Sequence, residues 1–376
     1  MSLSPDGLRF DEQVSYTLRG LFELCGYKRY KIGKFEEYGL YLENKNFISS
    51  ERVVTFTAPD GRLLALRPDV TLSIAKSTGA SRSKNEKLYY IENVCRLDPR
   101  TREFREINQM GLEFFGDIDD YATMEVIRLA LRSLAEIDSE FVLDISHMGF
   151  VGGLIDSLGV NEETRGKLLE CIRSKNLHDL EKTARAAGVS KLSADRMCRL
   201  AGLSGELEEC LSAAEEIADG DEMMKCAAGE LRRLSELISD HQLANRIVLD
   251  FSIVNDIGYY NGVIFQGYVR RVPRAVLSGG RYDNLLMRFG RDAGAIGFAL
   301  YLDEIGAKYT EPDEYDVDVF ILYDSASDLK ALSKEVGRFI YEGKRVRAEK
   351  TLPKDLRCAF VYRFQNGDLK EVNTDV

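Results

Sequence analysis

The sequence has few of the residues from which metal, redox and disulfide sites are built. Its 376 residues include three histidines and seven cysteines, and no two cysteines have the C-x-x-C spacing. An odd number of scattered cysteines indicates neither a disulfide framework nor a zinc site, and reduced thiols are typical of the cytosol. We therefore expect no metal, no cofactor and a cytoplasmic location. The histidines lie far apart in the sequence and do not by themselves suggest catalysis: His147, His178 and His241.

Two further absences concern membranes and nucleic acids. No apolar run approaches the length of a membrane-spanning helix, and the N-terminus, MSLSPDGLRFDE, lacks the apolar region of a signal peptide. The chain carries 51 Lys and Arg against 62 Asp and Glu, a net charge of −11. A general nucleic-acid-binding surface needs clustered Lys and Arg. We therefore expect no membrane contact and do not expect tRNA as a partner, although a local basic patch is compatible with this charge.

The residues that are present are typical of a globular chain with two or three domains. Hydrophobic residues make up 44% and charged residues 30%. Between Gly149 and Ala244, Leu, Ala, Glu, Lys and Arg dominate, aromatic residues nearly vanish, and apolar residues recur at helical spacing, which predicts a helical insertion. The predicted divisions are a sheet domain of residues 1–148 and 245–310, a helical insertion of residues 149–244, and a small α/β module of residues 313–376.

Residues 107–116 read INQMGLEFFG and predict a strand with two unlike faces. Side chains alternate along a strand, so Gln109, Gly111 and Glu113 share one face. An amine or imidazole of a small polar ligand can lie over Gly111, between the amide and the carboxylate. The alternative is that this face meets water. The opposite face is apolar and suits a core: Met110, Leu112 and Phe114.

A turn and a helix start place polar groups earlier in the chain. The β-rich runs 53–57 and 63–66 are joined through Pro59, Asp60 and Gly61, which predicts a hairpin. A proline, Pro68, follows, and it disfavours helix at the residue before it. The next helix therefore begins with Asp69 and Thr71 in its first turn. Their carboxylate and hydroxyl either cap that helix or bind a ligand.

Arginines follow the predicted strand of residues 87–94. Arg96 lies at its end, where a guanidinium can be held over the sheet face and bind a carboxylate in bidentate fashion. The remaining arginines of the loop are typical of a solvated turn: Arg100, Arg102 and Arg105.

Two tyrosines and two glycine-rich runs lie near the C-terminal end of the sheet domain. Tyr259 and Tyr260 precede the predicted strand 263–269; adjacent residues of a strand face opposite ways, so only one should point at a pocket unless a bulge or turn at Gly258 intervenes. In SGGRYDNL we expect a tight Gly279-Gly280 turn with a helix from Arg281, and GAIGFALYLDEI repeats the pattern of glycine followed by helix.

Periodicity predicts the other elements. They are a helix over 10–25 ended by Gly26, a helix over 119–135, strands over 141–146 and 246–254, and, in the last module, a strand over 317–322, a helix over 327–341 and a strand over 345–349.

Five separated motifs, in this order, resemble the class II catalytic core of histidyl-tRNA synthetase, and more closely its non-aminoacylating paralogue, the regulatory subunit of ATP phosphoribosyltransferase. The resemblance covers residues 8–305. The segment between the first two class II motifs is matched by LRPDVT, and motif 2 by CRLDPRTREFREINQMGLEFFG, with Arg96 in the place of its arginine. The histidine-specific tyrosine segment is matched by GYYNGVIF, and motif 3 and its approach by GAIGFALYLDEI and SGGRYDNL.

The resemblance implies an α+β fold: a six-stranded, mainly antiparallel sheet flanked by helices, dimerising through the first motif region. It also implies a histidine pocket over the sheet. Asp69 and Thr71 would hold the α-amino group, Arg96 the carboxylate, and Gln109 the amino or carboxylate end. Glu113 would bind the imidazole, and the two tyrosines would close over the ring: Tyr259 and Tyr260.

Two positions depart from the synthetase pattern. Asn255 stands where the synthetase has an arginine that stabilises the activated carboxylate, and Glu304 where motif 3 has an arginine that binds ATP phosphate. A glutamate facing a triphosphate would repel it. The C-terminal module is also shorter than an anticodon-binding domain, of which it resembles a remnant.

The resemblance and these departures together imply a regulatory subunit with no catalytic chemistry of its own. It would bind histidine, associate with a short-form ATP phosphoribosyltransferase in histidine biosynthesis, support its activity and transmit feedback inhibition. The alternative is a divergent histidyl-tRNA synthetase or another ATP-dependent ligase of this fold. A third reading is a structural or RNA-binding relic with an empty pocket.

Overall fold

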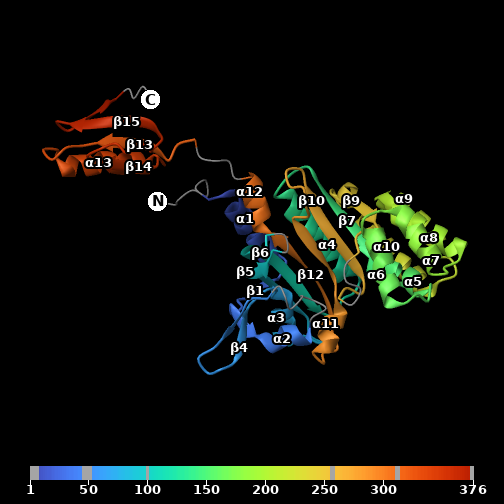
Figure 1. The fold of residues 1–376 in the computed structure, drawn as a ribbon. Coiled ribbons are helices and arrows are strands. Elements are labelled where there is room, and N and C mark those ends of the chain that lie inside the picture. The colour runs from blue at the N-terminus through green and yellow to red at the C-terminus, as the bar shows by residue number, and fades with distance from the viewer. Residues whose placement is uncertain (1–7, 45–52, 99–100, 255–258, 310–313, 373–376) are drawn as a thin grey trace. The chain divides into compact units, whose positions relative to one another are not determined.

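The computed structural model describes residues 8–44, 53–98, 101–254, 259–309 and 314–372, and the chain divides into two compact units at residues 309 and 310 (Figure 1). The unit of residues 8–309 contains the sheet on which the predicted ligand residues lie. The described residues 314–372 form the other unit. In neither unit is a described helix long and apolar enough to cross a membrane.

The main sheet confirms the expected antiparallel architecture. Six neighbouring strands run antiparallel in the order β5-β6-β12-β11-β10-β7, and shorter strands extend both edges. The central strands span β5 Glu86–Leu97, β6 Phe104–Gly116, β7 Phe141–His147, β10 Val263–Val269, β11 Leu277–Arg281 and β12 Gly294–Tyr301. The edge strands are β1 Lys28–Arg29, parallel to β5, and β9 Ile247–Asp250, parallel to β7, with β8 Ser204–Glu206 beyond it. Within the described chain the sheet therefore has nine strands rather than six.

The two faces of β6 divide as its alternation predicts. Met110 and Leu112 are fully buried and pack with apolar residues of α1, Phe10–Leu24, and α4, Asp120–Ala135. Gln109 and Glu113 point to the other face, where they are only 3% and 1% exposed. The alternative that this face meets water is therefore wrong. Its polar groups are enclosed, so they must find partners in the protein or in a ligand.

Most of the elements around that second face come from the N-terminal third of the chain, although Leu285 and Leu286 of a later helix pack there too. A three-stranded sheet, in the order β2-β4-β3, comprises β2 Phe35–Glu37, β3 Thr55–Thr57 and β4 Leu63–Leu66, and α2, Tyr38–Glu43, follows β2. After β4 the chain turns into α3, Val70–Ser77, as Pro68 predicts. The predicted hairpin is confirmed, although its first strand is shorter than expected.

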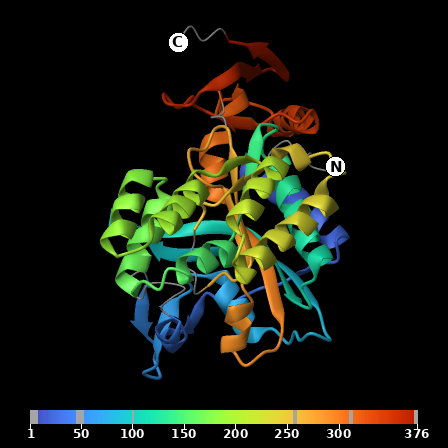
Figure 2. The same cartoon turned by 90° about the vertical axis from the view of Figure 1, so that its right-hand side faces the viewer.

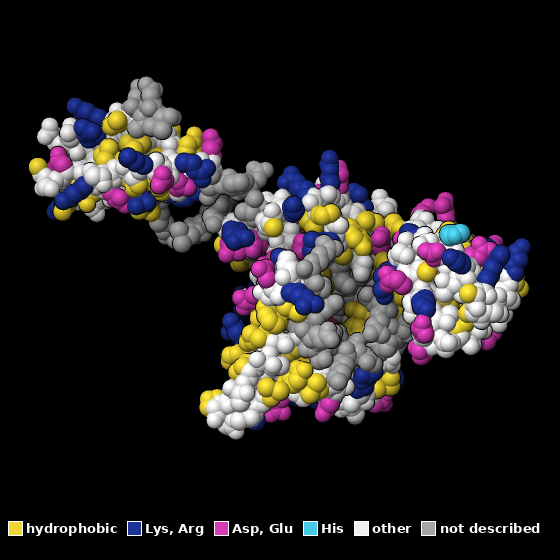
Figure 3. All heavy atoms as spheres, viewed as in Figure 1, with side chains coloured by type: hydrophobic (Ala, Val, Ile, Leu, Met, Phe, Trp, Pro, Cys, Tyr) yellow, Lys and Arg dark blue, Asp and Glu magenta, His cyan; other side chains and the backbone are white. Residues whose placement is uncertain are grey.

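Hydrophobic side chains are exposed on α1 and on this small sheet, and Figure 3 shows such side chains gathered over the region of β4. Phe35 and Phe56 pack edge to face, with ring centroids 5.4 Å apart, although both are exposed. The other exposed apolar side chains of these elements include Tyr16, Leu24 and Leu63, and Leu42 is exposed on the neighbouring α2.

The helical insertion consists of helices α5 to α10, which follow β7 and form their own layer beside the sheet (Figure 2). These helices are α5 Met148–Asp156, α6 Glu162–Arg173, α7 Leu177–Ala186, α8 Lys191–Gly202, α9 Leu207–Ile217 and α10 Glu222–Ile238. Their buried stripes are continuous with the core of the sheet, as the helical spacing of Leu, Ala and Ile predicts. A short 3₁₀ turn, Ala244–Arg246, then leads into β9.

The two glycine-rich runs form strands, not turns. Gly279 and Gly280 lie within β11, and the whole of GAIGFALY forms β12, so the predicted tight turn and the two early helix starts are wrong. The helices begin later, at α11 Asp283–Arg288 and α12 Leu302–Tyr309. The tertiary pairing overrides the local signal: a Cβ on Gly279 would lie 2.3 Å from the backbone oxygen of Gly297, so the strands need glycine to approach one another.

The C-terminal unit has a four-stranded sheet in the order β14-β13-β15-β16. Its elements are β13 Val317–Leu322, α13 Leu329–Tyr341, β14 Val346–Glu349, β15 Cys358–Gln365 and β16 Asp368–Glu371. The predicted strand, helix and strand are thus confirmed within two residues. Leu332 and Phe339 of α13 pack on Val319 and Ile321 of the central strand, which forms a small separate core.

Candidate functional site

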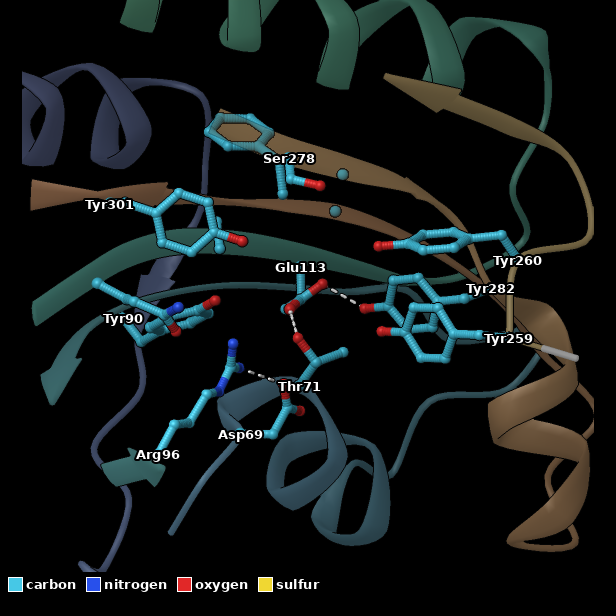
Figure 4. A pocket seen from close by; sticks show the side chains of 15 residues that line it. Asp69, Thr71, Tyr90, Arg96, Glu113, Tyr259, Tyr260, Ser278, Tyr282 and Tyr301 are labelled. Carbon is cyan, nitrogen blue, oxygen red and sulfur yellow. Dashed lines mark hydrogen bonds and ion pairs between the residues drawn. The ribbon is translucent and has the colours of Figure 1, made fainter. Parts of the chain in front are cut away.

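All seven ligand residues expected from the sequence line one pocket of about 320 Å³ over the main sheet (Figure 4). They come from four separate parts of the chain: the start of α3, the end of β5, the second face of β6, and the residues before β10. The seven are Asp69, Thr71, Arg96, Gln109, Glu113, Tyr259 and Tyr260.

Small residues of two neighbouring strands, β11 and β12, form the floor of this pocket. In the register of β6 with β12, Glu113 lies opposite Gly297. A Cβ at Gly297 would fall 2.0 Å from Glu113 Oε2 and 2.3 Å from the backbone oxygen of Leu112, so only glycine leaves room for the carboxyl group. Ser278 and Gly279 of β11 continue the floor. The recess in the sheet exists because side chains are missing along it.

Glu113 is the most enclosed ionisable group of the pocket. Its Oε1 accepts a hydrogen bond of 2.6 Å from Thr71 Oγ1, and its Oε2 accepts one from the Tyr282 hydroxyl. Burial raises the pKa of Glu113 to about 8, against the lowering effect of these two donors, and the charge of Asp69 raises it further. At neutral pH Glu113 is therefore mainly the neutral acid.

Three tyrosines form an aromatic wall beside Glu113. The rings of Tyr259 and Tyr282 are stacked with centroids 5.4 Å apart, and Tyr260 stands edge-on to Tyr259 at 4.3 Å. Both adjacent tyrosines line the pocket: they precede β10, so the alternation of a strand does not apply to them. Burial raises the pKa of all three phenols, so they remain neutral hydrogen-bonding groups.

The other end of the pocket carries an ion pair. Asp69 Oδ1 accepts the backbone N–H of Leu72 at 2.8 Å and so caps α3, while its Oδ2 lies 3.3 Å from Arg96 Nη2. Arg96 Nε also donates to the backbone oxygen of Pro68 at 2.6 Å. Asp69 is thus a cap and a pocket residue at once. A guanidinium has five N–H donors, and these two contacts use two of them.

Tyr90, Ser278, Tyr282 and Tyr301 also line the pocket and were not expected from the sequence. Tyr90 pairs with Gly111 across β5 and β6, and a Cβ on Gly111 would lie 2.4 Å from its hydroxyl. The space over Gly111 is therefore occupied by the Tyr90 side chain and not left open, contrary to the expectation. Tyr301 stands opposite Gln109 in the same way. Strand register is the signal that would have found both residues, and a single sequence does not supply it.

Of the two positions that depart from the synthetase pattern, the structure describes one. Glu304 lies on α12, does not line the pocket, and forms an ion pair of 3.1 Å with Arg274. Asn255 lies outside the described residues. No group of three or more His, Cys, Asp or Glu side chains that could hold a metal ion occurs in the part of the chain that the structure describes.

Comparison with known proteins agrees with this arrangement. A family model described as histidyl-tRNA synthetase matches residues 2–305. The ATP phosphoribosyltransferase regulatory subunit of Thermoanaerobacter sp. is 31% identical over 304 residues, covering 80% of this chain and 78% of that protein.

Two solved structures have the same fold. An ATP phosphoribosyltransferase regulatory subunit/histidyl-tRNA synthetase from Bacillus halodurans C is 25% identical with a TM-score of 0.77, covering 93% of this chain and 90% of that one. A chain of the ATP phosphoribosyl transferase (HisG:HisZ) complex from Thermotoga maritima is 18% identical with a TM-score of 0.60, covering 78% of this chain and 97% of that one. The chain belongs to the histidyl-tRNA synthetase family and, within it, to the regulatory subunits of ATP phosphoribosyltransferase.

Proposed function

We propose that the pocket binds free histidine and that this binding regulates a separate catalytic subunit. The observation that carries the proposal is the unlike chemistry of the two ends of one pocket. One end has a buried carboxyl group, Glu113, beside three tyrosines, and the other has the Asp69–Arg96 ion pair. A zwitterionic amino acid with an imidazole side chain is complementary to both ends.

The imidazole is assigned to the Glu113 end. A neutral imidazole has one N–H donor and one acceptor nitrogen, and a protonated carboxyl group can donate to the acceptor or transfer its proton to it. Either form gives a strong, directional hydrogen bond in a buried site. Phenol groups of Tyr259 and Tyr260 complete the surroundings of the ring. A ligand with an aliphatic side chain would leave the carboxyl group without this partner.

The α-amino and carboxylate groups are assigned to the ion-pair end. Asp69 is placed to accept from the α-ammonium group, and the Arg96 guanidinium to bind the carboxylate. The Thr71 hydroxyl donates to Glu113 and keeps lone pairs for the ammonium group. Gln109 also lines the pocket, and its amide can bind either group.

The partner that we propose is a short-form ATP phosphoribosyltransferase catalytic subunit, in the first step of histidine biosynthesis. The names of the relatives support it, as does the likeness to a chain of the Thermotoga maritima HisG:HisZ complex. This subunit would support the activity of its partner and transmit feedback inhibition. Such regulation requires that histidine bind two states of the assembly with different affinity, typically by about 1 to 3 kcal/mol.

We further propose a homodimer that buries the exposed apolar side chains of α1 and of the small sheet. Tyr16 and Leu24 on α1, and Phe35 and Phe56 on the sheet, are exposed in the single chain. A surface of this kind is typical of a protein interface. Sedimentation of the purified chain tests the dimer, and Phe35→Ser with Phe56→Ser should shift it toward the monomer.

The competing function is an ATP-dependent synthetase. Calorimetry with histidine tests ligand binding, and histidine-dependent ATP–pyrophosphate exchange tests activation. We expect heat on adding histidine and no exchange above the blank. Robust exchange by the pure chain would overturn the regulatory proposal, and no binding at millimolar histidine would leave the relic as the better description.

Mixing the chain with a short-form catalytic subunit tests the regulatory role. We expect the phosphoribosyltransferase rate to rise on mixing and to fall when histidine is added. A rate that does not respond to this chain would contradict the proposed partnership.

A further inference from the structure

The helical insertion begins directly beside the residues that carry the two tyrosines of the pocket. Residues 259–262, the tyrosine segment, lead from Tyr259 and Tyr260 into β10. The backbone N–H of Met148, the first residue of α5, donates to the backbone oxygen of Gly262 at 2.9 Å. His147, the residue before it, pairs with Val263. The start of the insertion is thus hydrogen-bonded to the end of the tyrosine segment.

The same place is joined to α10, the longest helix of the insertion. His147 Nε2 lies 3.1 Å from Glu230 Oε2, and the histidine side chain is only 4% exposed. A small cavity next to this contact is lined by Arg281 as well as by His147 and Glu230. The hydrogen bond from His147 lowers the pKa of Glu230, and the charge of Arg281 contributes. The contact is therefore a polar joint between insertion and sheet, buried at His147 and partly exposed at Glu230, whose side chain is 35% exposed.

Arg281 and Asp283 connect this joint to the aromatic wall. A Cβ on Gly262 would lie 2.9 Å from Arg281 Cδ, so the arginine side chain crosses the tyrosine segment at van der Waals distance. Arg281 Nε lies 2.9 Å from Asp283 Oδ2, and that oxygen also accepts from Asn261 Nδ2 at 3.2 Å. The backbone N–H of Asp283 donates to Asn261 Oδ1 at 2.9 Å.

Asp283 also holds the position of its neighbour in the chain, Tyr282, whose hydroxyl donates to Glu113. Its Oδ1 accepts from the backbone N–H of Ala295 on β12 at 2.8 Å, and the backbone oxygen of Ala295 accepts from the N–H of Tyr282, also at 2.8 Å. One carboxylate therefore binds both sides of the aromatic wall, the tyrosine segment and the base of Tyr282, without lining the pocket itself.

We propose that ligand binding in the pocket and the packing of α5 and α10 on the sheet are energetically coupled through these contacts, with Asp283 as the positioning residue. The inference rests on the proposed histidine site. A ligand that orders Tyr259, Tyr260 and Tyr282 also restrains Asn261 and Gly262, and through them Met148 and the His147–Glu230 joint. Ligand binding would then change the stability of α5 and α10, whose exposed surface lies far in sequence from the pocket residues.

An ion pair elsewhere between the insertion and the sheet supplies a matched control. Lys175, in the turn between α6 and α7, lies 2.7 Å from Asp250 of β9. Neither residue lines the ligand pocket, and neither is among the residues that line the cavity at His147. Removal of the Lys175–Asp250 ion pair weakens the packing of the insertion on the sheet by a comparable contact. It should leave the coupling intact.

Amide hydrogen exchange with and without saturating histidine tests the proposal on the full chain. In the native protein we expect histidine to slow exchange in β6 and β12, around the pocket, and also in α5 and α10, by roughly 5-fold. Glu230→Gln should keep the response of β6 and β12 and lose that of α10. By linkage, its affinity for histidine should fall by roughly 3- to 5-fold.

Asp283→Asn provides a second route if Glu230→Gln does not fold, and it should lose the α10 response in the same way. Lys175→Gln should retain both responses. An α10 response that persists in either Glu230→Gln or Asp283→Asn would overturn the coupling, as would native protein that protects β6 but not α10. Failure of the histidine site itself would give a different result: exchange would slow in neither β6 nor α10, and calorimetry would give no heat.

Discussion

The two ends of the pocket differ in how far their polar groups are buried. At the Glu113 end the carboxyl group is 1% exposed and receives two hydroxyl donors. At the Asp69–Arg96 end both side chains keep a quarter or more of their surface, 25% and 30%, and form an ion pair of 3.3 Å. Electrostatic interactions are much stronger in the buried environment than near water. Discrimination between side chains should therefore come mainly from the buried end, and attachment of any amino acid mainly from the open end.

Loss of the carboxyl group at the buried end should have the largest effect. Glu113→Gln keeps the shape but removes the proton that Glu113 shares with an imidazole, and charge-assisted hydrogen bonds are about twice as strong as neutral ones. We expect calorimetry to show histidine affinity reduced by roughly 10- to 100-fold, with feedback weakened and the dimer retained. Unchanged affinity would mean that the imidazole lies elsewhere.

Loss of the guanidinium at the open end should be smaller and should depend on the ligand. Arg96→Gln removes the proposed carboxylate partner, and we expect histidine to bind roughly 10-fold more weakly. Histamine, which has the imidazole but no carboxylate, should bind native protein and variant equally. An equal loss for both ligands would place Arg96 outside the carboxylate site and break the assignment of the two ends.

The pH dependence of binding separates the ends further. The ordinary pKa of a histidine side chain is about 6.5, and the pKa of Glu113 is raised by burial to about 8. Between these values the complex keeps the single proton that Glu113 already holds before binding. Below this range one proton must be released on binding, and above it one must be taken up. Affinity should therefore be greatest between them and fall by up to about tenfold per pH unit on either side.

Titration calorimetry from about pH 5.5 to about pH 9.5, a range that brackets both pKa values, measures this profile. Glu113→Gln should remove its alkaline limb. An alkaline limb that survives in the variant would assign it to another group.

The smallest effect is expected at the helix cap. Asp69→Asn keeps an N-cap acceptor for the Leu72 N–H, and Asn and Asp are about equal in that role. Thermal unfolding should therefore change little, while histidine affinity falls by about 3- to 10-fold through loss of the charge facing the α-ammonium group. A large fall in melting temperature would show that Asp69 is mainly structural.

The sequence could predict those features that depend on one segment at a time. Alternation placed Gln109 and Glu113 on one face, and Pro68 placed the start of α3 and the cap at Asp69. Pairing between distant strands decided the rest. Tyr90 and Tyr301 reach the pocket because of the register of β5 and β12 with β6. Gly279 lies in a strand because the backbone of Gly297 on β12 leaves no room for a side chain.

The two adjacent tyrosines are a second case in which the local sequence pattern was not enough to predict the site. The alternation rule is correct for a strand, but Tyr259 and Tyr260 come before β10 begins, so two adjacent rings can turn to the same side. Family resemblance, rather than local pattern, was needed to group these residues with Glu113.

Gly297 leaves a recess in the surface of one sheet. The recess is therefore formed within that sheet and does not need two domains to close over it. A methyl group added there would overlap Glu113 and a backbone oxygen that cannot move away. Gly297→Ala should therefore displace the Glu113 carboxyl group and strain the pairing of β12 with β6, and so close the proposed ligand recess without introducing a charge.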